Sequence, residues 1–330
     1  MKLKIKWLVT FESVLILLLL ALLLSYFFKY SQLKNIGENS GLLSPRVYAG
    51  LLEPKSFLIV NFSPLQEKIQ SHIGSKNVSV YLRNLRNGAS MGINEKMGYF
   101  PASLIKIPLA ILVMEKVENG ELGMDAVLPV TASDKSNTSG VLYKTDKKEL
   151  PVHTLIEKLL KDSDNTAYDV LFNQVKEKEM VLLFDYFDVN IPPIPSQTSP
   201  NANTILVSPK TMSNIFSSLF FSTLLNPMDS EYLLGLMTET AFDIKKIAGI
   251  PEGIIISQKY GVYYYDNRKY FHSCGILYIQ KSRIFYCVMT KDMGEGEAVQ
   301  TIAYVLNQTQ HYVIEEKAEL DAFKAKGIFD

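Results

Sequence analysis

Ser103 and Lys106 stand three residues apart, directly before an apolar run at 107–117 that predicts a buried helix. Side chains at this spacing share one helix face, so the lysine amine can reach the serine hydroxyl. A serine hydroxyl becomes a strong nucleophile when a neighbouring base takes its proton, and a buried lysine of lowered pKa can be that base. Pro108 removes one helical hydrogen-bond donor, which predicts a regular helix from about Lys106 and a tighter turn around Ser103.

Spacing alone does not identify a nucleophile, because Ser31 and Lys34 share it. Two further motifs follow: a Ser-Asp-Asn triplet at 163–165, at a predicted break between helices, and a Lys-Tyr-Gly triplet at 259–261, in a predicted strand. The first triplet is also compatible with a helix-capping turn, and the lysine of the second with a solvated strand position. Asp164 is interpreted as the residue that holds its turn.

In this order the three motifs resemble the S-x-x-K, S-D-N and K-T-G signature of the serine β-lactamase and penicillin-binding superfamily. The class A β-lactamase-like branch is the most similar, and the resemblance covers about residues 50–310. It extends to the surrounding segments 99–103, 139–142, 163–167 and 272–276. The resemblance implies an α/β (α+β) fold of the β-lactamase/transpeptidase type and an active-site serine hydrolase.

Three catalytic roles follow from the resemblance. Ser103 is expected to accept the acyl group, and Lys106 to be its activating base. Ser163 is expected to pass the proton to the leaving nitrogen.

Substrate binding is expected to fall to four further residues. Asn165 would orient the substrate amide, and Lys259 would place a positive charge for the substrate carboxylate. The backbone N–H groups of Ser103 and Val262, the latter next to Gly261, would meet the oxyanion. No cofactor and no metal are implied.

Two departures from the class A pattern bear on the reaction. That pattern carries a glutamate after S-D-N that activates the deacylating water, but no glutamate occurs here between Met180 and Ser230. Asn203 is a candidate for the asparagine that follows it. Tyr260 replaces the usual threonine or serine, which removes a small hydroxyl and adds bulk. Acylation chemistry is therefore expected, whereas the missing acid argues against rapid β-lactam turnover.

Three functions are compatible with these motifs. The first is a membrane-anchored, outward-facing hydrolase that forms an acyl-enzyme with a β-lactam or a cell-wall peptide amide. The second is a D-alanyl-D-alanine carboxypeptidase or transpeptidase of the penicillin-binding type. The third is a catalytically silent wall-binding protein of the same fold.

The N-terminal segment has the pattern of a membrane anchor. Three lysines within residues 2–6 precede an apolar run at 7–28, which is long enough to cross the bilayer as a helix. The leading lysines predict a single-pass protein with a cytoplasmic N-terminus and an extracytoplasmic catalytic domain. A cleaved signal peptide is the alternative. Residues 31–50 are expected to be a linker.

Residues 51–330 are expected to form one domain with a five-stranded antiparallel sheet flanked by helices. Period-two alternation and turn signals predict strands at 77–85, 89–94, 253–265, 270–279 and 283–290. Between the second and third strands, an insert at about 101–240 is expected to be an all-helical subdomain. A closing helix is predicted at 296–308.

Composition excludes several other classes of protein. Lys+Arg and Asp+Glu both number 34, so there is no basic excess of the kind that nucleic-acid binders show, and no nucleic acid partner is expected. The two cysteines, Cys274 and Cys287, make neither a disulfide scaffold nor a zinc module. A predicted turn at Lys281 and Ser282 places residue 276 opposite Cys287, so the cysteines are expected to lie diagonally, without a disulfide. The four histidines form no ligand spacing, and each is interpreted as a surface or core residue.

Overall fold

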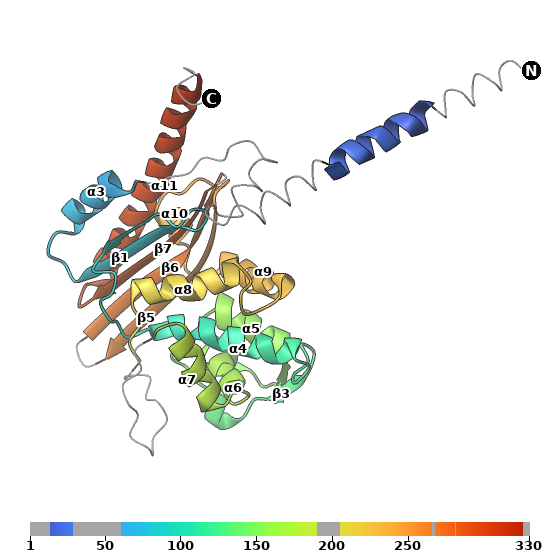
Figure 1. Cartoon of the computed structure of the whole chain (residues 1–330). Helices are drawn as coiled ribbons and strands as arrows, with labels where there is room; N and C mark the ends of the chain where they lie inside the picture. The colour runs from blue at the N-terminus through green and yellow to red at the C-terminus, as the bar shows by residue number, and fades with distance from the viewer. Residues whose placement is uncertain (1–13, 29–60, 190–204, 266–267, 281, 326–330) are drawn as a thin grey trace, which may run out of the picture. The chain divides into compact units, whose positions relative to one another are not determined.

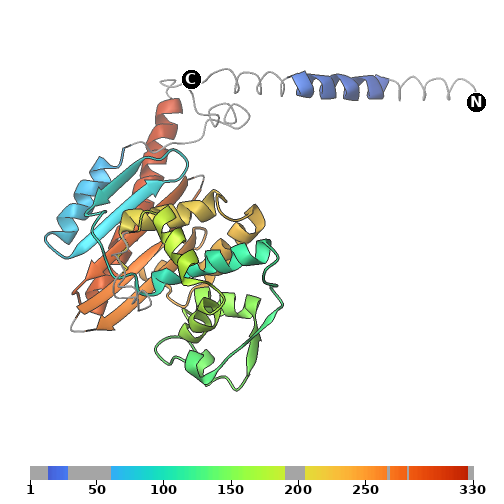
Figure 2. The ribbon, with the colours of Figure 1, turned by 60° about the horizontal axis from the view of Figure 1, so that its bottom comes forward.

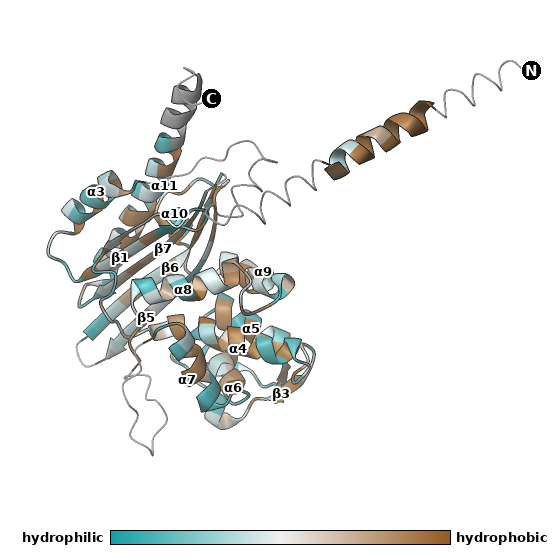
Figure 3. Ribbon diagram, viewed as in Figure 1, coloured by the Kyte–Doolittle hydropathy of each residue, from teal (hydrophilic) through white to brown (hydrophobic). Residues whose placement is uncertain are grey.

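The computed structural model describes residues 14–28, 61–189, 205–265, 268–280 and 282–325 (Figure 1). The chain divides into two units, Met1–Ser56 and Phe57–Asp330. In the first unit, residues 14–28 form a helix whose side chains are exposed and mostly apolar (Figure 3). Among the described residues, no helix has both the length and the apolar character needed to span a bilayer. Residues 7–13 of the predicted anchor and the predicted linker lie outside the described part.

The second unit is built on a five-stranded antiparallel sheet, as predicted. The spatial order is β2-β1-β7-β6-β5. Its strands are β1 (Val78–Asn84), β2 (Ser90–Ile93), β5 (Ile255–Tyr265), β6 (Arg268–Ile279) and β7 (Ser282–Lys291). β1 pairs with β7, from Val78 opposite Thr290 to Asn84 opposite Ile284. The two ends of the domain therefore meet in the middle of the sheet, and β5 forms one edge.

One face of the sheet is covered by helices from the two ends of the domain (Figure 1). They are α3 (Ser63–Ile73), α10 (Ile244–Ile247) and α11 (Glu295–Ala325). In α3, Leu65, Ile69 and Ile73 recur at helical spacing and are buried against this face. The predicted closing helix is confirmed in α11, which continues well beyond residue 308.

The other face carries the insert, whose helices pack into a second apolar core (Figure 2). These helices are α4 (Lys106–Glu118), α5 (Val152–Lys161), α6 (Asn165–Phe172), α7 (Glu177–Tyr186), α8 (Pro209–Phe220) and α9 (Pro227–Leu236). Four short 3-10 turns join them, η1 (Ala102–Ile105), η2 (Ala132–Asp134), η3 (Leu142–Lys144) and η4 (Met237–Glu239). α8 lies directly on β1, β6 and β7 and begins with a capping residue, Ser208, whose hydroxyl accepts from the N–H of Thr211.

The expectation of an all-helical insert is wrong in one detail. β3 (Val127–Pro129) and β4 (Glu149–Pro151) form a two-stranded antiparallel sheet within it. Each strand has three residues, which is too short for an alternating pattern to stand out in the sequence.

The expectation that the cysteines remain unpaired is also wrong. Cys274 and Cys287 are direct partners across β6 and β7, and they form a disulfide. The turn lies one residue earlier than predicted, because Ile279 pairs with Ser282 and Gln280 adopts a positive φ of 51°. This moves the register by two residues and brings the two cysteines opposite each other.

Candidate active site

Ser103 and Lys106 lie at the start of the buried helix, in the arrangement that the sequence predicts. Ser103 belongs to the 3-10 turn η1, and Lys106 is the first residue of α4. Residues 107–114 of α4 are buried, and they fix the helix in the core of the insert. Ala102, just before the nucleophile candidate, has a positive φ of 48°. A non-glycine residue in this region is under backbone strain, which is common at functional sites.

The amine of Lys106 is buried and faces both candidate hydroxyls. Its Nζ lies 3.3 Å from Ser103 Oγ and 3.2 Å from Ser163 Oγ. It also donates to the backbone carbonyl of Ser163 and, at 2.5 Å, to Oδ1 of Asn165. Burial lowers the pKa of Lys106 to about 7, although the carboxylates of Asp164 and Asp169 oppose the shift. The sequence motif at 103–106 and the triplet at 163–165 therefore meet around one amine.

Asn165 is held on both sides of its amide group. Its Oδ1 accepts from Lys106, and its Nδ2 donates to Thr138 Oγ1 at 2.6 Å. Ser136 contacts the same threonine, with 2.9 Å between the two hydroxyl oxygens. Thr138 thus fixes the orientation of Asn165, a role that no pattern in the sequence indicates.

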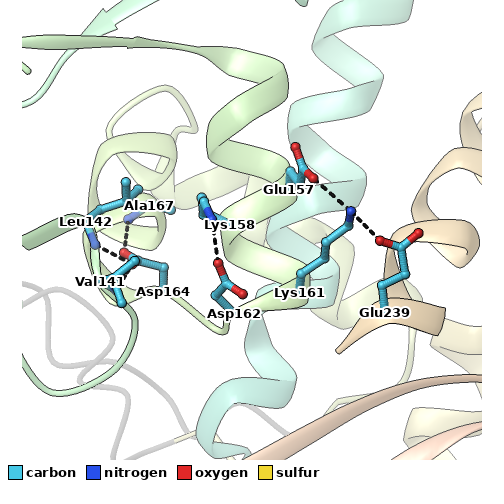
Figure 4. Close-up of polar contacts among 9 residues, drawn as sticks. All are labelled: Val141, Leu142, Glu157, Lys158, Lys161, Asp162, Asp164, Ala167 and Glu239. Atoms are coloured by element: carbon cyan, nitrogen blue, oxygen red, sulfur yellow. Dashed lines mark hydrogen bonds and ion pairs between the residues drawn. The ribbon is translucent and has the colours of Figure 1, made fainter. Parts of the chain in front are cut away.

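Asp164 holds the turn that carries Ser163 and Asn165 (Figure 4). One carboxylate oxygen accepts from the N–H groups of Val141 and Leu142 at 2.6 and 2.8 Å, and the other caps α6 through the N–H of Ala167 at 3.0 Å. The predicted structural role of Asp164 is confirmed. The triplet is therefore both a capping turn and a part of the site.

Ser163 has a positive φ of 55°. This unfavourable conformation is stabilised by the buried hydrogen bonds of Asp164, and it places both the hydroxyl and the carbonyl of Ser163 at Lys106.

Lys259 is fully buried, so its alternative assignment as a solvated strand position is wrong. Within the described residues its Nζ has no hydrogen-bond partner and lies 4.8 Å from the ring centroid of Tyr260. Burial lowers the pKa of Lys259 well below its usual value, and the nearby Lys106 lowers it further, whereas Asp162 opposes the shift.

Gly261 brings the edge strand β5 against the turn that carries Ser103. A Cβ atom at position 261 would lie 3.1 Å from Ser103 N and from the carbonyl oxygen of Pro101. Val262 follows and pairs with Phe271. The edge strand and the N–H of Ser103 are thus adjacent, as the predicted oxyanion site requires, and the donor roles themselves remain a prediction.

His272 supports the nucleophile turn from β6, where it pairs with Gly261. Its Nδ1 accepts from the N–H of Thr290, and its Nε2 lies 2.9 Å from the carbonyl oxygen of Phe100 and therefore carries the proton. Burial lowers the pKa of His272 to about 4, so the ring is uncharged at neutral pH. The scattered spacing of the histidines indicates only a surface or core residue at this position. Its place in the segment 272–276, which shares the family resemblance, and its place in an apolar strand next to the motif strand are the signals that could have marked it.

The comparisons with known proteins agree with this geometry. A family model described as the beta-lactamase enzyme family matches residues 64–310. The chain belongs to the β-lactamase enzyme family. This member is 24% identical over 215 residues to the beta-lactamase VEB-1 of Pseudomonas aeruginosa, which covers 59% of this chain and 70% of that protein.

The solved structures that superpose on this chain include proteins described as beta-lactamases and as PBP-A. A beta-lactamase from Chitinophaga pinensis superposes with a TM-score of 0.68 at 20% identity, over 76% of this chain and 100% of that one. The structure of PBP-A superposes with a TM-score of 0.67 at 18% identity, over 77% of this chain and 97% of that one. At these identities the likeness establishes the fold of this family member. Within the described residues, no group of three or more His, Cys, Asp or Glu side chains could hold a metal ion.

Proposed function

We propose that this β-lactamase family member is a serine acyl hydrolase that forms an acyl-enzyme through Ser103. The observation that supports this most directly is the buried amine of Lys106, which lies within 3.3 Å of both Ser103 Oγ and Ser163 Oγ and has a pKa lowered to about 7. A general base works best when its pKa is close to the working pH.

The contacts of Lys106 define a path for the proton. The carbonyl of Ser163 and Oδ1 of Asn165 can only accept, so they take the two N–H donors of an uncharged amine. With both donors taken, the single lone pair of the uncharged amine can accept a proton from a hydroxyl, and the Oγ atoms of Ser103 and Ser163 lie 3.3 and 3.2 Å from Nζ. Ser103 Oγ therefore gives its proton to Lys106 as it bonds to the substrate carbonyl carbon.

Collapse of the tetrahedral intermediate breaks the bond from that carbon to the leaving nitrogen. Ser163 donates its hydroxyl proton to the leaving nitrogen and takes a proton from Lys106 in its place. The N–H groups of Ser103 and Val262 stabilise the oxyanion, at about 2.7–4 kcal/mol for each donor by analogy with other enzymes. Attack by water on the Ser103 ester then releases the acid and restores the serine.

Hydrolysis of the acyl-enzyme is expected to be slower than its formation in this chain. No glutamate occurs between Met180 and Ser230, so the usual activator of the deacylating water is missing. This favours a long-lived acyl-enzyme and, as a second candidate function, a carboxypeptidase or transpeptidase of the penicillin-binding type. A neighbouring structure of a PBP-A variant is described as an acyl-enzyme complex with penicillin G (TM-score 0.65, 19% identity, over 78% of this chain and 100% of that one). A catalytically silent wall-binding protein of the same fold is the third candidate, and it would need neither hydroxyl contact of Lys106.

We propose further that residues 7–28 anchor the domain in the cell membrane, with the N-terminus in the cytoplasm and the catalytic domain outside. The lysines before the apolar run and the exposed apolar helix at 14–28 support this proposal. The disulfide of Cys274 and Cys287 also supports it, because disulfides persist in oxidising compartments. Alkaline extraction of membranes, followed by protease treatment of intact cells, tests both parts. Release by alkali or protection from protease would contradict the anchor or its orientation, respectively.

Labelling with a fluorescent penicillin tests the catalytic proposal. The wild type should form a covalent adduct at Ser103, Ser103→Ala should form none, and Ser133→Ala, which changes an exposed serine, should label normally. Turnover of the chromogenic cephalosporin nitrocefin separates a β-lactamase from a penicillin-binding peptidase. Lack of a covalent adduct with both β-lactams and acyl phosphonates would favour the silent wall-binding protein.

A further inference from the structure

Lys259 is enclosed by the described part of the protein without an acceptor for its amine. Its side chain is 0% exposed, and its Nζ has no hydrogen-bond acceptor among the described residues. An ammonium group without a partner is costly in such a place, since burial favours the uncharged amine. The lowered pKa of Lys259 is consistent with this geometry.

The ring of Tyr260 is the aromatic neighbour of this amine. Lys259 Nζ lies 4.8 Å from the ring centroid, within the range of cation–π contacts, so the ring favours the charged form of the amine, against the effect of burial. Phe242 also contacts this ring, with 5.2 Å between the two ring centroids. The hydroxyl of Tyr260 has a raised pKa, because the group is largely buried and Asp162 is close.

The segment that carries Phe242 is fixed at both of its ends. Gln258 donates from Nε2 to the carbonyl of Phe242 at 2.6 Å and to Thr240 Oγ1 at 3.1 Å. The N–H of Ala241 donates to the carbonyl of Lys161, at the end of α5. Lys161 itself is paired with Glu157 and Glu239 at 2.8 and 2.6 Å (Figure 4). The backbone that carries Phe242 is therefore held in place beside the tyrosine ring.

We propose that Tyr260 makes the site selective for acyl donors without a free carboxylate beside the scissile bond, such as esters and amidated peptides. This inference rests on the proposed acyl transfer at Ser103. A carboxylate that approaches Lys259 meets the ring of Tyr260 first and finds an amine that favours its uncharged form. A neutral ester or amide loses no ion pair there, and its apolar surface packs on the aromatic pair formed by Tyr260 and Phe242.

Benzylpenicillin and its methyl ester provide a matched test, because they share one acyl group and differ only in the carboxylate. Acylation of Ser103 is measured by mass spectrometry, and each rate constant is divided by that of alkaline hydrolysis of the same compound. The wild type should acylate with the ester at least as fast as with the acid. Tyr260→Thr should raise the acid-to-ester ratio by at least about tenfold, because it opens the approach to Lys259.

The control is Tyr264→Thr, which changes an exposed tyrosine of the same strand. It should leave the acid-to-ester ratio at the wild-type value. As a second measurement, calorimetry gives the affinity of Ser103→Ala for benzylpenicillin and for its methyl ester. This variant cannot be acylated at residue 103, so the comparison reports the binding preference alone. The ester should bind at least as tightly as the acid, and Tyr260→Thr in that background should reverse the order.

The outcomes separate the two proposals. Adduct formation with a wild-type preference for the acid of tenfold or more would overturn the selectivity and leave the proposed function in place. An unchanged acid-to-ester ratio in a folded Tyr260→Thr variant would also overturn it. If neither compound acylates Ser103, the proposed function fails and this inference fails with it.

Discussion

Gly140 lies directly against the carboxylate of Asp164. Its φ is 86°, and a Cβ atom at this position would overlap Asp164 Oδ2, which accepts from the N–H groups of Val141 and Leu142. The glycine thus allows the 140–142 segment to wrap around the buried acid. That acid in turn holds Ser163 and Asn165 at Lys106.

Gly140→Ala should therefore damage both stability and chemistry. The alanine must adopt a positive φ, which costs about 1 kcal/mol, and it displaces a buried hydrogen-bonded carboxylate, for a total loss of at least about 3 kcal/mol. Gly120→Ala is the control, since Gly120 has a φ of 72° but no neighbour within 4 Å of an added Cβ. Urea unfolding measures both losses, and penicillin acylation should slow only in Gly140→Ala. Equal losses would contradict the role given to the Asp164 contact.

The rate of acylation should depend on pH through Lys106. Its pKa is lowered to about 7, so the fraction of uncharged base rises as pH passes through that value. The second-order rate constant for penicillin labelling should rise with a midpoint near pH 7. Lys106→Arg should lose about 10²–10⁴-fold and the pH dependence with it, because arginine stays protonated. A flat profile between pH 5 and about 9 in the wild type would exclude Lys106 as the base.

Asp169 should destabilise the fold at neutral pH. Burial and the neighbouring Asp134 raise the pKa of its carboxyl group to about 6, against the opposing charge of Lys106. The folded chain then binds a proton that the unfolded chain releases near pH 4, so stability falls as pH rises from about 4 to 6.

Asp169→Asn should consequently raise the free energy of unfolding by about 1 kcal/mol at pH 7.5, a value that is reduced because solvent screens this partly exposed group. Below about pH 4 the substitution should have no effect. Asp146→Asn, at an exposed site, is the control. Chemical unfolding at the two pH values measures the difference. If Asp169→Asn raises the free energy of unfolding equally at both pH values, the carboxylate charge is not the source of the gain.

Loss of the disulfide should lower stability without removing the fold. Cys274 and Cys287 are separated by 13 residues, and a closed loop of this size contributes about 3 kcal/mol in the chain-entropy description. Urea unfolding with and without dithiothreitol measures the loss in the wild type. A Cys274→Ala, Cys287→Ala double variant should be insensitive to the reductant. No effect of dithiothreitol on the wild type would show that the bridge is absent or adds nothing.

Much of this architecture can be predicted from local patterns. β1 alternates with period two, turn residues separate the other strands, and Pro108 marks the change from η1 to α4, so these elements are predicted near their observed bounds. The three motifs that meet at Lys106 could be recognised because each combines rare residue types in a fixed order. Their meeting depends on Asp164, whose capping chemistry is itself readable from sequence.

The features that were missed depend on contacts between distant residues. The disulfide follows from a turn placed one residue earlier at Gln280, and local turn signals do not fix a hairpin register to that accuracy. His272 and Thr138 act on Phe100 and Asn165, which are far from them in sequence. The aromatic surroundings of Lys259 include Tyr260, and Tyr260 in turn contacts Phe242, which only the folded chain places beside it.

The pairing of β1 with β7 has a consequence for biosynthesis. The central ladder joins residues 78–84 to residues 284–290, so the sheet cannot close until the ribosome has made almost the entire domain. A nascent chain that ends before β5 holds α8 without the strands β6 and β7 on which it packs. Its apolar surface must stay exposed or be shielded by a chaperone during that interval, and the serine turn meets Gly261 only in the last stage of folding.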